Sequence, residues 1–512
     1  MQIQPPLLRS ARRVSIALRA SRLLLTASLL AGVPALQAAP WAEVGDRALR
    51  SDIEVLAARG LISGPTTTWP IPVGFFSALQ DEALLAKQPE YIRLAAHRVL
   101  DRLGGRNAHR GLKPAAELRF ASEPNLIRDF GATARDQVDA RAGLDYDGER
   151  IGGSLRAGTQ TRFDGTGSKV SLDGSYLTFL AGGWQIYGGL VDQWYGPGWT
   201  SSLVLSNNAR PFPKIGFLRN DPRPFETKWL SWLGPWQLNF FVGALEEKQR
   251  IDRNTAVGSL RFSFVPVKGL EVAISRVVEF CGRNHPCKPV VAAFGINNTD
   301  KDRNQSNDEA TIELKYAYDF NILSFSPYLQ IMNEDTGPFT HSFTSYLGGA
   351  SWAGPWGKDG AQWRLTGEYS DSRATLDAFS FGGVRTPGVA YNNTGYDDGF
   401  RYRGRTLGFS LDSDSTLFSL AGSVTDTRGW NYRLVYYNAH ISTAELAAVQ
   451  ATGSTTRNVV SARPVTVNQI EAGVTVPYRN FNFDLVVRGQ DGRVFPATSG
   501  QVNVELGIGY RF

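Results

Sequence analysis

Apolar and polar residues alternate with a period of two over long stretches of the chain after about residue 114. The clearest stretch runs from Val502 to the final Phe512, where every second residue is apolar and the residues between are Asn, Glu, Gly or Arg. Residues 138–146, 310–320 and 430–436 repeat the pattern. Because successive side chains of a β-strand point to opposite faces, this period predicts strands with one apolar and one polar face.

Two architectures account for such strands. In a soluble sandwich the apolar faces pack on a core, whereas in a membrane barrel they face lipid and the polar faces line the lumen. The barrel is favoured because strands of about ten residues match a tilted bilayer crossing, and because the chain stops on an aromatic-ended strand. We therefore predict an all-β transmembrane barrel, in which about 400 residues allow roughly 16 to 20 antiparallel strands, an even number.

A helical period precedes the strands, from about residue 46 to 104. It predicts three short helices, with Gly60 ending the first and Pro89 opening the third. An even strand number puts both barrel ends on the periplasmic side, so we predict a periplasmic α-helical bundle at residues 39–112 and a barrel at residues 113–512. The periodic apolar positions are Leu49, Ile53, Leu56, Phe75, Leu79, Ile92, Ala96, Val99 and Leu103.

The first residues are typical of an export signal. A positive stretch is followed by the apolar run Leu23–Val33 and by small residues that offer a cleavage site after Ala38, so residues 1–38 are predicted to be a signal peptide; a disordered basic arm is the alternative. The run is too short to span a bilayer. Most of the formal net charge of +6 leaves with this segment, so the charge indicates no nucleic-acid partner. The positive residues are Arg9, Arg12, Arg13, Arg19 and Arg22.

The two cysteines, Cys281 and Cys287, lie in one short polar segment with His285 between them. In an exported protein this spacing predicts a disulfide, and the alternative of a metal site is weaker because two thiols and one histidine fall short of a tetrahedral set. No metal, cofactor or catalytic residue is predicted. The scattered histidines form no recognisable nucleophile–base arrangement, and no phosphate-binding loop occurs.

Several sequence blocks carry a family resemblance. The stretch Asp192–Pro213 reads DQWYGPGWTSSLVLSNNARPFP, and Trp229–Trp236 reads WLSWLGPW. Together with Phe225-Glu226-Thr227, Tyr402-Arg403-Gly404-Arg405 and Leu407-Gly408, these blocks resemble the Wzi family of capsule assembly proteins. The resemblance implies an 18-stranded outer-membrane barrel with a periplasmic helical bundle. It also implies a lectin-like role without hydrolase activity, in which capsular or extracellular polysaccharide is held at the cell surface.

Sugar recognition requires flat aromatic faces and planar polar groups, and acidic glycans add a need for arginine. The segment Tyr391–Arg405 supplies this mixture, although a barrel-rim girdle with solvated charges is the alternative interpretation. A second candidate, Trp194, Tyr195 and Trp199, surrounds a rigid Gly-Pro-Gly turn and is expected to be structural. The predicted glycan-binding residues are Tyr391, Tyr396, Asp397, Arg401, Tyr402 and Arg403.

The predicted inward positions carry charges of both signs, among them Glu313, Lys315, Arg364 and Glu368. Unpaired charges in a restricted lumen are costly, so we expect a lumen narrowed by ion pairs. The alternative function is an outer-membrane porin or substrate-specific channel. The expected partners are polysaccharide, outer-membrane lipid and a polysaccharide export complex that the periplasmic helices dock. Long polar segments are expected to be extracellular loops: Phe280–Pro289, Asn297–Asn307, Phe381–Arg405 and Ala451–Pro464.

Overall fold

The computed structural model describes residues 40–103, 111–160, 170–245, 250–283, 285, 287, 306–334, 343–376, 385–494 and 501–511. The predicted signal peptide and the terminal Phe512 lie outside these residues.

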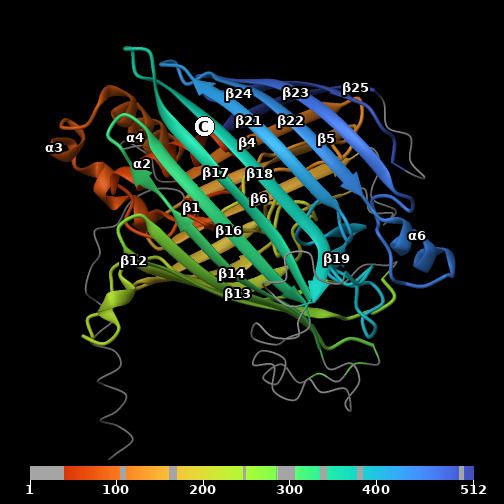
Figure 1. Ribbon diagram of the computed structural model, residues 1–512. Coiled ribbons are helices and arrows are strands. Elements are labelled where there is room, and N and C mark those ends of the chain that lie inside the picture. The colour runs from red at the N-terminus through yellow and green to blue at the C-terminus, as the bar shows by residue number, and fades with distance from the viewer. Residues whose placement is uncertain are drawn as a thin grey trace, which may run out of the picture.

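The strands form one closed antiparallel barrel of 18 crossings, which confirms the predicted fold (Figure 1). β14 and β15 both pair with β16 and count as one crossing. The last strand pairs with the first and closes the wall. The crossings are β4 (Gly111–Ala121), β5 (Val138–Asp147), β6 (Ile151–Gln160), β7 (Tyr176–Ala181), β8 (Trp184–Gly189), β10 (Lys214–Arg219), β11 (Trp236–Ala244), β12 (Ala256–Val267), β13 (Leu270–Phe280), β14 with β15 (Ser306–Tyr316 and Tyr318–Asp319), β16 (Ser324–Glu334), β17 (Phe343–Trp356), β18 (Ala361–Leu376), β21 (Thr416–Thr425), β22 (Asn431–Ile441), β23 (Val465–Tyr478), β24 (Phe481–Gln490) and β25 (Val502–Arg511).

The alternating sequence pattern separates the two faces of the wall. On β25, Leu506 is 49 % exposed on the outside, whereas its neighbour Glu505 is 1 % exposed in the lumen. The same contrast is seen on β24, where Leu485 is exposed and Arg488 is buried. The outer surface is therefore an apolar belt that suits lipid, and the polar residues line the interior.

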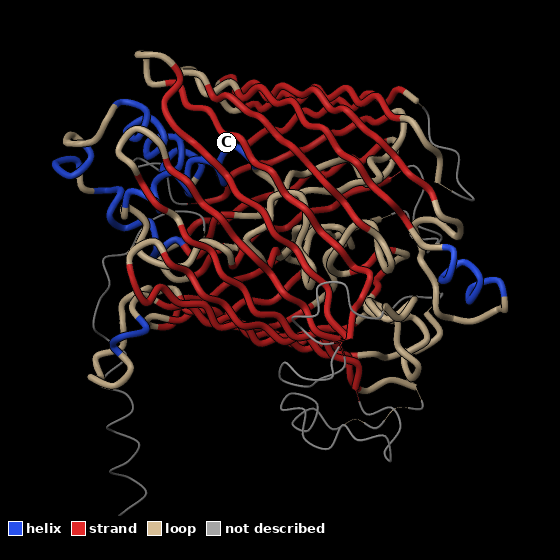
Figure 2. Tube along the Cα trace, in the orientation of Figure 1, coloured by secondary structure: helices blue, strands red, loops and turns tan. Residues whose placement is uncertain are grey.

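The two barrel ends differ in their connections and in what lies beside them. Tight turns join most strands at one end, for example at residues 268–269 and 479–480, with the connection 220–235 as an exception, and most long connections lie at the other end. The helical segment packs at the tight-turn end, as Figures 1 and 2 show. By the strand parity this is the periplasmic end.

The helices begin and end close to the predicted positions. α2 (Arg47–Arg59) is capped by the side chain of Asp46 and ends at Gly60, whose φ is 80°. The second predicted helix is a 3₁₀ helix, η1 (Val73–Gln80), followed by the short α3 (Glu82–Leu85), because extended Asp81 separates them. α4 (Glu90–Arg102) starts one residue after Pro89, which takes the N-cap position in place of the predicted first turn. None of the described helices is long and apolar enough to cross a membrane.

One apolar core joins α2, η1 and α4, and it includes Trp69, Phe130 and Trp194 from the inside of the barrel. The helical segment is thus continuous with the contents of the lumen. The domain boundary at residues 112/113 stays a prediction, and the first barrel strand starts at Gly111.

Candidate functional site

The polar face of α2 points into the lumen. Arg50, Asp52 and Glu54 are buried there, although charged residues on a helix usually face solvent. The carboxylate oxygens of Glu54 form ion pairs with side-chain nitrogens of Arg50 at 3.1 Å, Lys315 at 3.2 Å and Arg364 at 3.5 Å. Burial by itself raises the pKa of Glu54, but these three cations outweigh it and lower the pKa to about 2.

Further ion pairs fill the lumen between the strands. Arg261 meets Glu313 at 2.6 Å, and Arg488 bridges Glu471 at 2.5 Å and Glu505 at 2.9 Å. All five side chains are almost completely buried. Such pairing satisfies charges that would otherwise be costly in a restricted interior. The structure therefore agrees with the expectation of a lumen narrowed by ion pairs.

The block that reads DQWYGPGWTSSLVLSNNARPFP crosses the lumen to the helical segment. Its short strand β9 (Trp194–Tyr195) pairs with β2 (Thr68–Trp69) of the N-terminal segment. Arg50 donates hydrogen bonds to the carbonyls of Pro197 and Gly198, both at 2.8 Å. The aromatic residues of the Trp-Tyr-Gly-Pro-Gly turn are thus part of the interior packing, as their rigid turn predicted.

Glu368 of β18 fixes the next residues of this block. Its carboxylate accepts hydrogen bonds from the backbone N–H groups of Trp199 (2.6 Å), Thr200 (3.2 Å) and Ser201 (2.8 Å). Gly198 has no room for a side chain, because a Cβ there would collide with the carbonyl oxygen of Ser201. The glycine of this family block is therefore required by close packing.

The segment 385–415 packs over the block at the extracellular end of the barrel. Tyr391 is completely buried and donates its hydroxyl to the carbonyl of Leu203 at 2.6 Å. Arg401 makes two hydrogen bonds to Asp412, at 2.8 and 3.1 Å, and Tyr402 packs against Phe212. We call the packed assembly of residues 190–213, 385–415 and 442–464 the loop platform. It includes the short helix α6 (Ala444–Ala451) and the hairpin β19–β20 (Arg401–Tyr402 and Arg405–Thr406).

The predicted disulfide between Cys281 and Cys287 is formed. The ring of His285, inside this loop, stacks on Tyr396 with 4.0 Å between centroids. Tyr396 donates its hydroxyl to the carbonyl of Cys281 at 3.0 Å, and burial raises its pKa. Among the described residues, no group of three or more His, Cys, Asp or Glu side chains could hold a metal ion.

The six predicted glycan-binding residues fall into two groups. Tyr391, Tyr396, Arg401 and Tyr402 are buried. The polar groups of Tyr391, Tyr396 and Arg401 bond within the protein, to the Leu203 carbonyl, the Cys281 carbonyl and the Asp412 carboxylate. Asp397 and Arg403 are partly exposed. The first group was predicted from residue type alone. Because these four side chains are buried, they hold the loops in place. Their contact with glycan stays a prediction.

Arg403 stands at the tip of the β19–β20 hairpin. It has a φ of 51°, and the following Gly404 has a φ of 72° and is surrounded by open space on the side where a Cβ would project. Two successive residues with positive φ define a tight hairpin turn that normally carries Asn or Asp and Gly. Arg405, the last residue of the candidate segment, is also partly exposed. Sequence analysis did not single out Arg457, a further partly exposed arginine of the platform.

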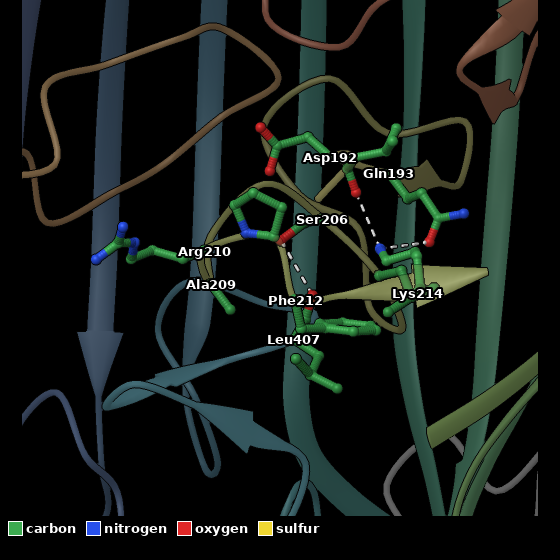
Figure 3. Close-up of a pocket in the computed structure, with 11 residues that line it drawn as sticks. Asp192, Gln193, Ser206, Ala209, Arg210, Phe212, Lys214 and Leu407 are labelled. Atoms are coloured by element: carbon green, nitrogen blue, oxygen red, sulfur yellow. Dashed lines mark hydrogen bonds between the residues drawn. The ribbon is translucent and has the colours of Figure 1, made fainter. Parts of the chain in front are cut away.

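Figure 3 shows a small hollow within the platform, lined by Asp192, Ser206, Arg210, Lys214 and Leu407 among others. Lys214 donates to the carbonyl of Val191 at 2.9 Å and to Gln193 Oε1 at 3.1 Å. The hollow has room for about one water molecule, which is far less than a sugar ring needs.

Comparisons with known proteins agree with this architecture. Residues 108–494 match the family model described as capsule assembly protein Wzi. A Klebsiella pneumoniae protein described as an uncharacterized 55.8 kDa protein in the cps region is 27 % identical over 373 residues, which cover 70 % of this chain and 71 % of that protein. The solved structure of Escherichia coli Wzi, described as an outer-membrane carbohydrate-binding β-barrel involved in group 1 capsule assembly, superposes with a TM-score of 0.75 at 21 % identity and covers 92 % of this chain and 99 % of that one. The chain belongs to the Wzi family of capsule assembly proteins and is an outer-membrane β-barrel.

Proposed function

We propose that this protein binds capsular or related extracellular polysaccharide on the outer surface of the loop platform and so holds the polymer at the cell. The observation that carries the proposal is the platform itself. Long connections that are ordered by buried ion pairs and hydrogen bonds, such as Arg401 with Asp412 and Tyr391 with Leu203, form a preorganised surface. Preorganisation lowers the entropy that binding would otherwise cost. The carbohydrate binding described for the Escherichia coli protein supports the same function.

Within this proposal, Arg403 contacts the glycan directly. Its positive φ is unfavourable for an arginine, whereas Asn or Gly would adopt it readily, so the arginine stands there at a conformational cost. A partly exposed guanidinium at a hairpin tip can form two parallel hydrogen bonds to a sugar carboxylate. Asp397, which accepts a hydrogen bond from Thr455 at 3.1 Å, is placed to bind hydroxyl groups. The buried tyrosines and Arg401 then act by holding the hairpin.

The decisive cellular experiment deletes the gene. We expect polymer synthesis to continue while polymer appears in the medium. Polymer that stays bound to the deletion strain would contradict the proposal.

The decisive binding experiment uses purified protein and the polysaccharide of the same cells. Arg403→Asn should weaken binding several-fold without loss of stability, because Asn suits the turn but lacks the cation. Arg428→Ala is the matched control, since Arg428 lies in an exposed turn at the opposite barrel end. Equal binding by Arg403→Asn and the unsubstituted protein would move the site away from the hairpin. We also propose that binding involves no bond cleavage, so the polymer should keep its length after incubation.

The channel alternative requires a continuous water-filled lumen. The ion pairs of Glu54 and Arg261 and the strand pairing of β9 with β2 occupy that space in the described part of the chain. We therefore expect no large, steady conductance in planar bilayers, and such a conductance would favour the channel.

We further propose that the helical segment presents a surface to a periplasmic export complex. His97 and Asp101 are exposed on α4, on the side away from its buried residues. A photocrosslinker at Asp101 should capture an export component, whereas one at Lys358, in an exposed turn of the same barrel end, should not. Equal capture at both positions would contradict a specific surface.

A further inference from the structure

One connection at the periplasmic end is unlike its neighbours. Residues 220–235 join β10 to β11, whereas the turns on either side of this connection consist only of residues 182–183 and 268–269. The connection contains all but the last residue of the family block WLSWLGPW, whose Trp236 begins β11, and the short helix η2 (Ser231–Leu233). Two of its side chains, Trp229 and Trp232, are 75 % and 61 % exposed. Exposed tryptophans in a structured segment indicate a surface that is covered by something else.

This connection lies against the outside of the barrel wall. Trp236 and Phe264 are cross-strand partners on β11 and β12, and they face outward because Gln237 and Ser263 beside them are buried in the lumen. Trp236 is nevertheless only 8 % exposed, since other parts of this region cover it. In Figure 1 the connection is the yellow-green coil beside the end of β12, at the same barrel end as α2 and α4.

Three contacts show what covers this outward face. Phe225 stacks on Trp236 with 4.3 Å between ring centroids, and the guanidinium of Arg219 lies 3.7 Å from the ring of Trp236. Trp232 meets Phe264 edge to face at 6.1 Å. The connection is therefore continuous with the apolar belt that faces lipid, at the depth where the strands end.

The composition of the segment fits the boundary between headgroups and acyl chains. Tryptophan is enriched there because its ring is apolar and its N–H is polar. Lys228, next to Trp229, is exposed and carries an ammonium group that suits a lipid phosphate. We propose that residues 227–235 form a membrane anchor, which lays Trp229 and Trp232 into the headgroup region of the periplasmic leaflet and binds phospholipid phosphate through Lys228.

The test measures the depth of the segment in a bilayer. Full-length Trp229→Cys and Lys228→Cys proteins are labelled with a fluorescent thiol probe, which the disulfide-bonded native cysteines do not take up. They are then reconstituted in phosphatidylcholine vesicles that contain lipids brominated near the headgroup or near the chain end. Lys358→Cys serves as the aqueous control at the same barrel end, and Leu485→Cys serves as the control within the lipid-facing belt.

We expect lipids brominated near the headgroup to quench the probe at position 229 at least twofold more than the probe at position 358. The probe at position 485 should respond more to the deeper bromines. The Lys228→Cys variant retains both tryptophans, so its quenching decides the matter if Trp229→Cys alters the loop. Probes at 228 and 229 that are open to aqueous iodide and insensitive to bromolipid would overturn the anchor and assign the surface to a periplasmic protein instead.

Discussion

Glu54→Ala is the substitution that most directly tests how the helical segment is held in the barrel. The carboxylate lies within 3.5 Å of Arg50, Lys315 and Arg364, and all four side chains are buried. Removal of the single acid leaves three cations close together without their shared partner. The perturbation therefore acts on the contact between α2 and strands β14 and β18, and it leaves the lipid-facing wall unchanged.

The expected loss of stability can be estimated in two ways. Breaking a buried ion pair by removing one partner costs about 3–5 kcal/mol. The pKa gives a second estimate, because each pKa unit corresponds to about 1.4 kcal/mol, and the fall from 4.5 to about 2 amounts to about 3 kcal/mol. Since the folded pKa lies below the unfolded value, this stabilisation is complete above about pH 4.5 and is lost as the pH falls toward 2.

The assay is urea unfolding of the protein in lipid vesicles, followed by tryptophan fluorescence and by heat-modifiable mobility on gels. Glu90→Ala is the matched control, because its ion pair with Arg93 on α4 is exposed and should contribute at most about 1 kcal/mol. The reasoning is refuted if Glu54→Ala and Glu90→Ala are equally stable. It also fails if the stabilisation from Glu54 is already lost between pH 7 and pH 5.

Three further substitutions test the platform and the packing beneath it. Arg401→Ala leaves Asp412 buried without its ion-pair partner and should expose the segment 385–415 to trypsin, with Arg401→Lys intermediate; unchanged digestion would show that the pair is dispensable. Gly198→Ala should lower stability by about 1–3 kcal/mol in the same urea assay because its Cβ meets a carbonyl oxygen, and a neutral result would mean that the turn can move. Replacing both disulfide cysteines by serine should speed hydrogen exchange around Tyr396 while the strands keep their protection; slowed or unchanged exchange would exclude a clamping role for the disulfide.

The barrel was predictable because its physical cause is local. A strand between lipid and a polar lumen must alternate apolar and polar residues. The sequence from Val502 onward therefore predicts which face each side chain of β25 occupies. The ends of the helices were predictable for the same reason, because the signal lies in the neighbouring residues: Gly60 adopts the left-handed conformation that glycine favours. Charged residues on α2 followed no such rule. Their pattern is that of a solvent-facing surface, and the partners Lys315 and Arg364, which make that face an interior one, lie far away in the sequence.

The glycan-binding site stays a prediction, and what the structure adds is the burial and pairing of its candidate side chains. Aromatic and arginine residues are gathered in segment 391–405, but composition does not distinguish an arginine in a buried ion pair from one that is partly exposed. Arg401 is held by Asp412, which lies in the same connection and was the available signal. Arg403 differs because it precedes a glycine between two short strands, and that dipeptide position marks a turn tip. The choice between the two arginines thus depended on local turn chemistry as much as on tertiary contacts.

The pairing of β9 with β2 has a mechanical consequence. The extracellular connection that contains β9 and the N-terminal segment that contains β2 enter the barrel from opposite ends, and Arg50 adds two hydrogen bonds across the same junction. A polymer that pulls outward on the platform would load this junction along the barrel axis, and the force would pass to α2 on the periplasmic side. The strands of the wall would then carry only part of the traction. In such an arrangement a pulling force on the extracellular loops would cross the membrane through the interior of the barrel, by way of the β9–β2 junction.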